Sequence, residues 1–162
     1  MADSLENNDW MTNIEQMATS QKIMTLAVVW QRGAWSSPVY YLYWKKVFYF
    51  FSSPDSRHIK GSQKMGGRAG ASIFVDALSF DEIQGIQMQG SIEPVKKNGK
   101  GLAAAGAYLK RFAISHGKVD ALTFIQQQYR ASFYQFIPVH LIYIDNRVAM
   151  GFKKEVEVFH QS

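Results

Sequence analysis

The stretch VFYFFSSPDSRHIK, residues 47–60, decides the fold, because an aromatic run ends abruptly in hydroxyl side chains and spaced basic residues follow. The run predicts a β-strand over residues 47–52, since aromatic and β-branched residues favour extended backbone. A helix over residues 54–63 is predicted next, with Ser53 as its cap and Pro54 in the first helical position. The hydroxyls, the free amides and the positive end of this helix predict an anion-binding turn.

Three basic residues lie close to this predicted helix start. Arg57, His58 and Lys60 fall within about one and a half helical turns, where a phosphate monoester can accept charge-assisted hydrogen bonds. The alternative is a capped surface helix with solvated cations, because Ser/Pro/Asp turns are common and the segment has no glycine-rich phosphate motif. The segment alone leaves both interpretations open.

The preceding segment predicts two more strands. Residues 23–31 contain the β-rich run TLAVVW, and residues 36–44 read SSPVYYLYW. Gly33 lies in a short segment that can turn between them, and Lys45-Lys46 makes a polar break before residues 47–52. The three strands form a meander that leads into the serine and arginine turn.

This order of elements resembles the pyridoxamine 5′-phosphate oxidase-like proteins, which have the FMN-binding split-barrel fold. The matching motifs are Thr-Leu-Ala at 25–27, Ser-Pro-Val-Tyr at 37–40 and Ser-x-x-Ser-Arg-His at 53–58. Downstream, RAGASIFV at 68–75 and GIQMQGSIEPV at 85–95 are similar to the family's small-residue strand and the long strand after it. Residues 132–154 resemble the closing hairpin of a small branch of these proteins. The resemblance covers roughly residues 20–155.

The rest of the chain completes one predicted domain over residues 1–162. The fold class is mainly β with peripheral helices, a six- to seven-stranded antiparallel split barrel whose closure hides strand edges. An N-terminal helix is expected within residues 1–20, and strands at 68–76 and 82–95. A helical insertion, residues 98–130, contains a helix from residue 102 to about 112 and another at 119–130. The last strands, 133–145 and 147–158, are predicted to meet in a tight hairpin at Asp145-Asn146.

Composition narrows the class of protein. The 162 residues are 47% hydrophobic, enough for one real core. No run of eighteen apolar residues exists and the acidic N-terminus is unlike a signal peptide, so a cytoplasmic protein outside the membrane is expected. The chain has no cysteine, which excludes disulfides and thiolate chemistry. The net charge of +5 comes from dispersed cations, a pattern that disfavours nucleic acid as the partner.

The FMN that the resemblance implies has two chemical needs. Its phosphate requires donors and positive charge, and its isoalloxazine ring requires an apolar slot with backbone donors and acceptors along one edge. Family members place the flavin against the strand that matches residues 36–40, where Pro38 leaves ladder positions unpaired. Gln87 and Gln89 lie one period-two step apart, although solvated polar residues are an equal interpretation of that pair. The candidate cofactor residues are Ser37, Pro38, Val39, Tyr40, Ser52, Ser53, Ser56, Arg57, His58, Lys60, Gln87, Gln89 and, from a partner chain, Lys153 and Lys154.

A homodimer with two cofactor sites at its interface is what the resemblance implies. The aromatic residues between 30 and 51 exceed what one small barrel can hold, so some should face a partner subunit. An aromatic surplus is equally compatible with a ligand pocket.

The substrate and the catalytic residues stay open. No residue stands out as a nucleophile or general base, and the four histidines lack metal-ligand spacing. A true pyridoxamine 5′-phosphate oxidase should carry a C-terminal arginine motif, but residues 153–159 contain no arginine. We expect an FMN-binding oxidoreductase with an unassigned substrate. The alternatives are a haem-binding or haem-degrading relative using His160, a deazaflavin protein, and a cofactor-free binding module with a basic and aromatic surface.

Overall fold

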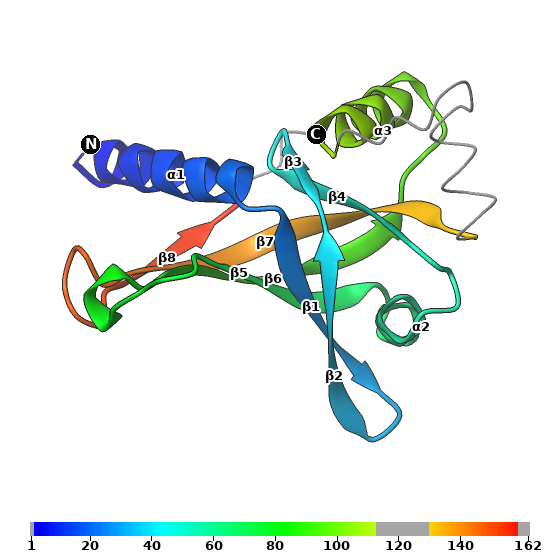
Figure 1. The fold of residues 1–162 in the computed structure, drawn as a ribbon, viewed down its shortest axis with the longest axis horizontal. Helices are drawn as coiled ribbons and strands as arrows, with labels where there is room; N and C mark the ends of the chain where they lie inside the picture. The colour runs from blue at the N-terminus through cyan, green and yellow to red at the C-terminus, as the bar shows by residue number, and fades with distance from the viewer. Residues whose placement is uncertain (1, 113–129, 159–162) are drawn as a thin grey trace.

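A computed structural model describes residues 2–112 and 130–158, with side chains from residue 10 onward. One antiparallel sheet dominates it, and the helices lie around that sheet (Figure 1). The helices are α1 (Ala2–Ser20), α2 (Arg57–Lys64) and α3 (Gly99–Arg111), with a 3-10 turn at Phe80–Glu82. The strands are β1 (Ile23–Trp30), β2 (Gly33–Tyr40), β3 (Leu42–Trp44), β4 (Val47–Ser52), β5 (Arg68–Phe74), β6 (Gln84–Pro94), β7 (Ser132–Asp145) and β8 (Lys153–Glu157).

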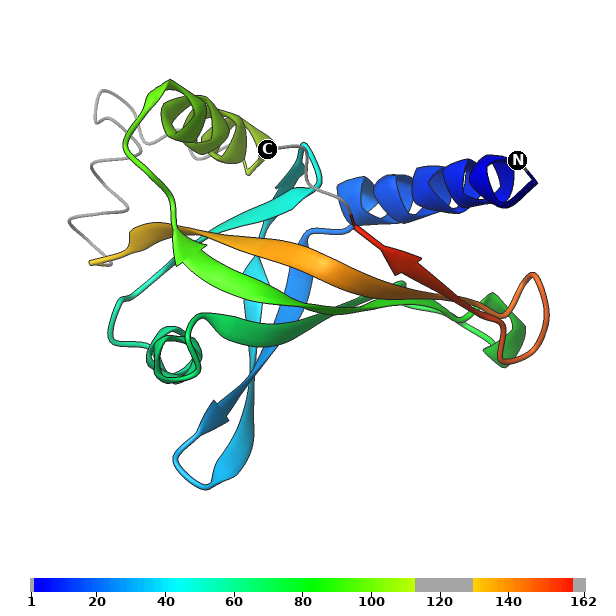
Figure 2. The same ribbon diagram turned by 180° about the vertical axis from the view of Figure 1, so that it is seen from behind.

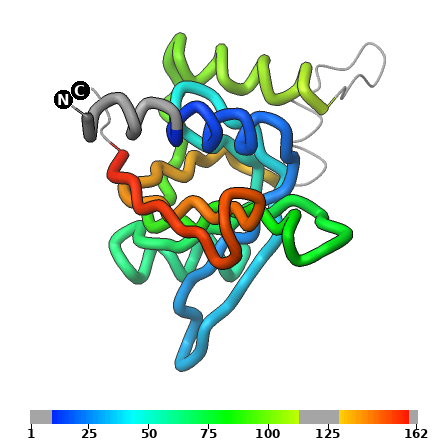
Figure 3. Tube along the Cα trace, turned by 90° about the vertical axis from the view of Figure 1, so that its left-hand side faces the viewer, coloured from blue at the N-terminus to red at the C-terminus, as the bar shows by residue number. Residues whose placement is uncertain are grey.

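The strand order shows why the sheet curls. Its path runs β2-β1-β5-β6-β7-β4-β3, and β8 pairs with β7 off this path. The two end strands, β2 and β3, are separated in the chain only by Tyr41, so the sheet must bend until its ends meet there. Tyr41 fixes this corner, because its amide donates to the Lys22 carbonyl at 2.9 Å and its buried hydroxyl donates to the Ala18 carbonyl at 2.8 Å. Figure 3 shows the strands curving round the core.

Alternation along β4 divides the interior into two clusters. Phe48 and Phe50 face the main core, which fills the inside of the curled sheet. Tyr49 faces the other way, into a second cluster that α3 covers with Ala104 and Tyr108. In Figure 2 both α1 and α3 lie at the top and the β1–β2 hairpin projects at the bottom, but α1 packs on the main core and α3 on the second cluster.

A β-bulge between Gln89 and Gly90 bends the long β6–β7 ladder. Gly90 is required at this bend, because a Cβ atom there would overlap the Ile137 carbonyl oxygen. The bulge comes directly after the strand segment that holds Gln87 and Gln89.

The prediction of a mainly β split barrel is confirmed, but three local predictions are wrong. Residues 36–44 form two strands rather than one, because Tyr41 turns the corner between them. The helix predicted from Pro54 begins at Arg57, and Ser56 rather than Ser53 occupies the position before it. Pro54 and Asp55 lie in the turn.

The closing hairpin is also longer than predicted. β7 ends at Asp145 and β8 begins only at Lys153. The buried Asp145 carboxylate accepts hydrogen bonds from Tyr143 and Arg147, which holds the chain in a wide loop, and Gly151 takes the positive φ of 75°. The helix predicted at 119–130 falls almost entirely outside the described residues.

Candidate functional site

The candidate site begins where β4 runs into α2. After Ser52 the chain turns, with the Ser56 amide donating to the Ser53 carbonyl at 3.0 Å and the Asp55 amide donating to the Ser53 hydroxyl at 3.2 Å. Ser56 has extended backbone at φ −64° and ψ 149°, as the residue before a helix requires. Its side chain nevertheless makes no capping hydrogen bond. Among the residues that the structure describes, no side-chain acceptor therefore caps the first amides of α2.

The Ser56 hydroxyl belongs instead to what we name the Ser–His cluster, formed by Ser52, Ser56 and His58. His58 Nε2 lies 2.7 Å from Ser52 Oγ and 3.2 Å from Ser56 Oγ, and the two hydroxyl oxygens are 3.1 Å apart. His58 is only 8% exposed, and this burial lowers the pKa of its imidazole. The neutral ring is favoured, so the cluster contributes hydrogen-bond donors more than charge.

Arg57 supplies the charge, and it does so beside β2. Its guanidinium lies 4.2 Å from the ring centroid of Trp35, and the Trp35 indole donates to the Ser37 hydroxyl at 2.8 Å. Arg57 is itself exposed, so its donors remain open to a ligand. This contact brings together the turn predicted for the phosphate and the strand predicted for the flavin ring. Trp35 was not among the predicted site residues, although its place two residues before Ser37 could have indicated it.

Lys60 is less available than predicted. Its ammonium forms an exposed ion pair with Asp55 at 2.8 Å, which lowers the pKa of the Asp55 carboxyl. Lys64, further along α2, lies 5.0 Å from the centroid of the Trp30 ring. Arg57 is thus the cation that the helix places nearest its open start without a carboxylate partner among the described residues.

The predicted flavin strand is the edge strand β2. Pro38 is exposed and pairs with Thr25, which agrees with the expectation that a proline belongs on an edge. Val39 is 9% exposed and packs in the main core, so only its backbone can reach a ligand. Tyr40 is 57% exposed, and its carbonyl accepts a hydrogen bond from the Tyr108 hydroxyl of α3 at 3.2 Å.

The remaining candidates lie on β6 and β8. Gln87 and Gln89 are both exposed on one face of the sheet, as predicted, with Ser72 and Gly70 of β5 beside them. Lys153 and Lys154 point to opposite faces of β8, next to Ile144 and Tyr143 of β7. No contact in the described residues joins these four residues to the Ser–His cluster within one chain. In the same part of the chain, no group of three or more His, Asp or Glu residues could hold a metal ion.

None of the described helices is both long enough and apolar enough to cross a membrane.

Comparison with known proteins identifies the architecture. The sequence matches no family model and no curated protein. Solved structures match it closely in fold but weakly in sequence. ChuZ from Campylobacter jejuni has a TM-score of 0.73 at 10% identity, over 93% of this chain and 60% of that one. This fold is the split barrel of the pyridoxamine 5′-phosphate oxidase-like proteins.

Two further solved structures share this fold. A heme-binding protein from Mycobacterium smegmatis has a TM-score of 0.67 at 15% identity, over 88% of this chain and 55% of that one. A candidate pyridoxamine 5′-phosphate oxidase from Listeria innocua has a TM-score of 0.64 at 8% identity, over 83% of this chain and 97% of that one. This chain therefore spans little more than half the length of the heme-binding protein.

Proposed function

We propose that this protein binds FMN and acts as a flavin-dependent oxidoreductase of the split-barrel type, with a substrate still unassigned. The observation that carries the proposal is the open start of α2. Its first amides lack a side-chain cap, because Ser56 instead joins Ser52 and His58, and Arg57 stands beside it with an exposed guanidinium. Free amides at a helix start, serine hydroxyls and an arginine are the donor set that a phosphate monoester requires.

The chain's own residues divide the work of binding. Ser52, Ser56 and the α2 amides would donate to the phosphate oxygens, and Arg57 would add charge and geometry. Trp35 orients Arg57 toward β2, where the backbone of residues 37–40 would face the flavin ring. When bound, the flavin supplies the electron chemistry, so these residues need only hold and orient it.

A homodimer would complete this site. Several exposed apolar residues lie on the outer face of the sheet, and three of them are Ile23 at 47%, Val29 at 51% and Phe74 at 67%. Small side chains fill the space between them, since Thr25, Ala27 and Ser72 have the same outward parity in the β1–β5 register. A smooth apolar face of this kind suits a second copy. The partner would then bring Gln87, Gln89, Lys153 and Lys154 toward the flavin.

The first test is the absorbance spectrum of the purified protein. We expect a flavin band near 450 nm, or its appearance on adding FMN, and calorimetry should show FMN binding far more tightly than riboflavin, which lacks the phosphate. Equal affinity for the two would show that the open start of α2 is only structural. Sedimentation at low micromolar concentration should find a dimer, and an 18 kDa monomer would contradict that part of the proposal.

Haem is the second candidate ligand, because one of the split-barrel neighbours is a heme-binding protein. A Soret band near 400 nm in the same spectrum would favour it. Among the described histidines, His58 Nε2 already contacts two serines, and His140 Nε2 lies 3.7 Å from a Glu155 carboxylate oxygen. His160, the histidine expected to serve haem, lies outside the described residues. The open start of α2 is what supports the flavin as the first candidate.

A further inference from the structure

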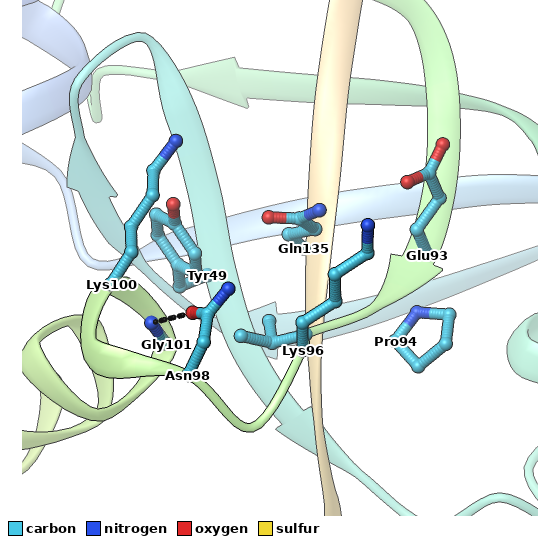
Figure 4. A pocket seen from close by; sticks show the side chains of 9 residues that line it. Tyr49, Glu93, Pro94, Lys96, Asn98, Lys100, Gly101 and Gln135 are labelled. Carbon is cyan, nitrogen blue, oxygen red and sulfur yellow. Dashed lines mark hydrogen bonds between the residues drawn. The ribbon is translucent and has the colours of Figure 1, made fainter.

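Two adjoining cavities lie beneath the start of α3, on the face of β4 that looks away from the main core. One has a volume of about 280 Å³ and is lined by Tyr49, Gln135, Lys96 and Lys100 among others (Figure 4). The other has about 480 Å³ and contains the apolar side chains of Leu102, Ala105 and Phe133. Both cavities share Pro94, Val95, Lys96 and Gly101 as a common wall. They form a polar compartment beside a more apolar one.

Tyr49 is the buried polar side chain of the polar compartment. It is 1% exposed, and its ring stacks on Phe133 with the centroids 5.7 Å apart. Its hydroxyl has no hydrogen-bond partner among the residues that the structure describes, yet Figure 4 shows it between Lys100 and the Gln135 amide. The hydroxyl oxygen is not sealed off, because the one enclosed side-chain polar atom without a partner among the described residues is Arg111 Nε. The Tyr49 hydroxyl therefore opens into the cavity, where a ligand can accept its hydrogen bond. Burial raises the pKa of Tyr49, so the group stays a donor at physiological pH.

The charges around this hydroxyl favour an anion. Lys96 and Lys100 line the polar compartment, and neither forms an ion pair within the described part of the chain. The one carboxylate at the rim, that of Glu93, accepts a hydrogen bond from the Ser91 hydroxyl at 3.4 Å. Lys97 and Arg130 add positive charge to the second compartment. The cavity therefore has an excess of positive charge beside the Tyr49 hydroxyl, a donor that opens into it.

We propose that this cavity binds a small organic anion with an apolar body, such as an aryl-alkyl carboxylate. The Tyr49 hydroxyl and the Lys96 and Lys100 ammonium groups hold the anionic end. The apolar body lies against Leu102, Ala105 and Phe133. This site goes beyond the proposed flavin site and does not depend on it, because Tyr49 and the Ser–His cluster belong to opposite faces of β4.

Calorimetric titration of the whole protein with 4-phenylbutyrate tests the site. We expect binding at millimolar concentration or below, and about tenfold weaker binding in Tyr49→Phe and in Lys100→Gln. Lys110→Gln is the matched control, since it removes the same charge from the other end of α3, and it should bind like the wild type. Thermal unfolding of each variant confirms that the fold is kept. The Tyr49→Phe change leaves the ring and its stacking in place.

Three results would overturn the proposal. The first is the absence of binding, and the second is unchanged affinity in both Tyr49→Phe and Lys100→Gln. The third is equal affinity for the neutral 4-phenylbutan-1-ol or for acetate, which would remove the need for the charge or for the apolar body. Arg57→Ala separates this site from the flavin site: it should weaken FMN and leave 4-phenylbutyrate binding unchanged. A loss of both ligands in that variant would place 4-phenylbutyrate at the flavin site and contradict the assignment.

Discussion

The starts of α2 and α3 both lie next to basic side chains, but only the start of α3 has a side-chain cap. At α3 the Asn98 side chain accepts a hydrogen bond from the Gly101 amide at 3.0 Å, and the Asn98 carbonyl accepts one from Leu102 at 2.9 Å. At α2 the carbonyl of Ser56 accepts from Lys60 at 3.0 Å, while its hydroxyl turns to His58. One helix start is closed by its own cap, and the other stays open.

The presence or absence of a side-chain cap determines which hydrogen-bond donors each helix start offers to a ligand. A side-chain cap is typically worth about 1 kcal/mol, and at α2 that stabilisation is forgone. The amides there remain available to a ligand, whereas at α3 the donors are side chains, the Tyr49 hydroxyl and two lysines. We therefore expect α2 to suit a phosphate, which many donors can surround, and α3 to suit a simpler anion.

The largest expected effect is at the open start. Arg57→Ala should weaken FMN binding about ten- to a hundredfold, or about 1.5–3 kcal/mol, because a charge-assisted hydrogen bond is lost. Arg57→Lys should recover only part of that affinity, since an ammonium lacks the planar two-pronged geometry. Calorimetry with FMN measures both variants.

Apo stability is the control for Arg57. The stacking on Trp35 at 4.2 Å is worth about 0.5–1 kcal/mol at an exposed site, so Arg57→Ala should stay folded. Unchanged FMN affinity in Arg57→Ala would show that Arg57 does not contribute to FMN binding. A collapse of the apo protein would make it a structural residue.

The two caps provide the next contrast. Asn98→Ala should lower the free energy of unfolding by about 1 kcal/mol, because the Gly101 amide loses its acceptor. Ser56→Ala should lower the free energy of unfolding of the apo protein by less, since the Ser56 hydroxyl caps no amide. The same change should weaken FMN binding. Urea denaturation of the two variants tests this directly. Equal losses of stability in the two variants would contradict the distinction between a capped and an uncapped helix start.

The sequence predicts the barrel well because its signals are local and repeated. Aromatic runs with period-two alternation, broken by Gly33 and Lys45-Lys46, are enough to place most strands. The corner at Tyr41 could not be predicted from the run SSPVYYLYW, since its cause is the distant Ala18 carbonyl that accepts the Tyr41 hydroxyl. The long closing loop was missed for the same reason, because buried Asp145 is held by side chains that a turn propensity does not include.

The candidate site shows the same division. The motif at residues 53–58 locates the anion-binding turn, but it suggests Ser53 as the cap and gives Lys60 more freedom than it has. The pairing of Arg57 with Trp35 and the Ser–His cluster arise from tertiary contacts between β2, β4 and α2. Tyr49 looks in the sequence like any other aromatic of a strand. Only the packing of α3 shows that Tyr49 lines a cavity.

The smallest expected effect concerns the pH dependence of the open start. Burial lowers the pKa of His58 in the folded protein below its ordinary value of 6.5, so between these two pKa values the unfolded chain binds more protons than the folded one. The apo protein should therefore lose stability as the pH falls through about 6.5, with a slope below the single-proton limit of about 1.4 kcal/mol per pH unit. His58→Gln should remove this part of the slope.

Urea denaturation of the wild type and of His58→Gln between pH 5.5 and 8 isolates the effect, because the other three histidines are common to both proteins. The lowered pKa values of Asp55 and Asp145 place their titration at more acidic pH. Saturating FMN should reduce the dependence of wild-type stability on pH. The negative phosphate beside the Ser–His cluster stabilises the protonated imidazole and raises its pKa toward the unfolded value. The same FMN addition to His58→Gln should change its slope far less. If FMN flattens the slope of both proteins equally, the phosphate does not lie beside His58. The open start of α2 would then be no more a phosphate site than the capped start of α3.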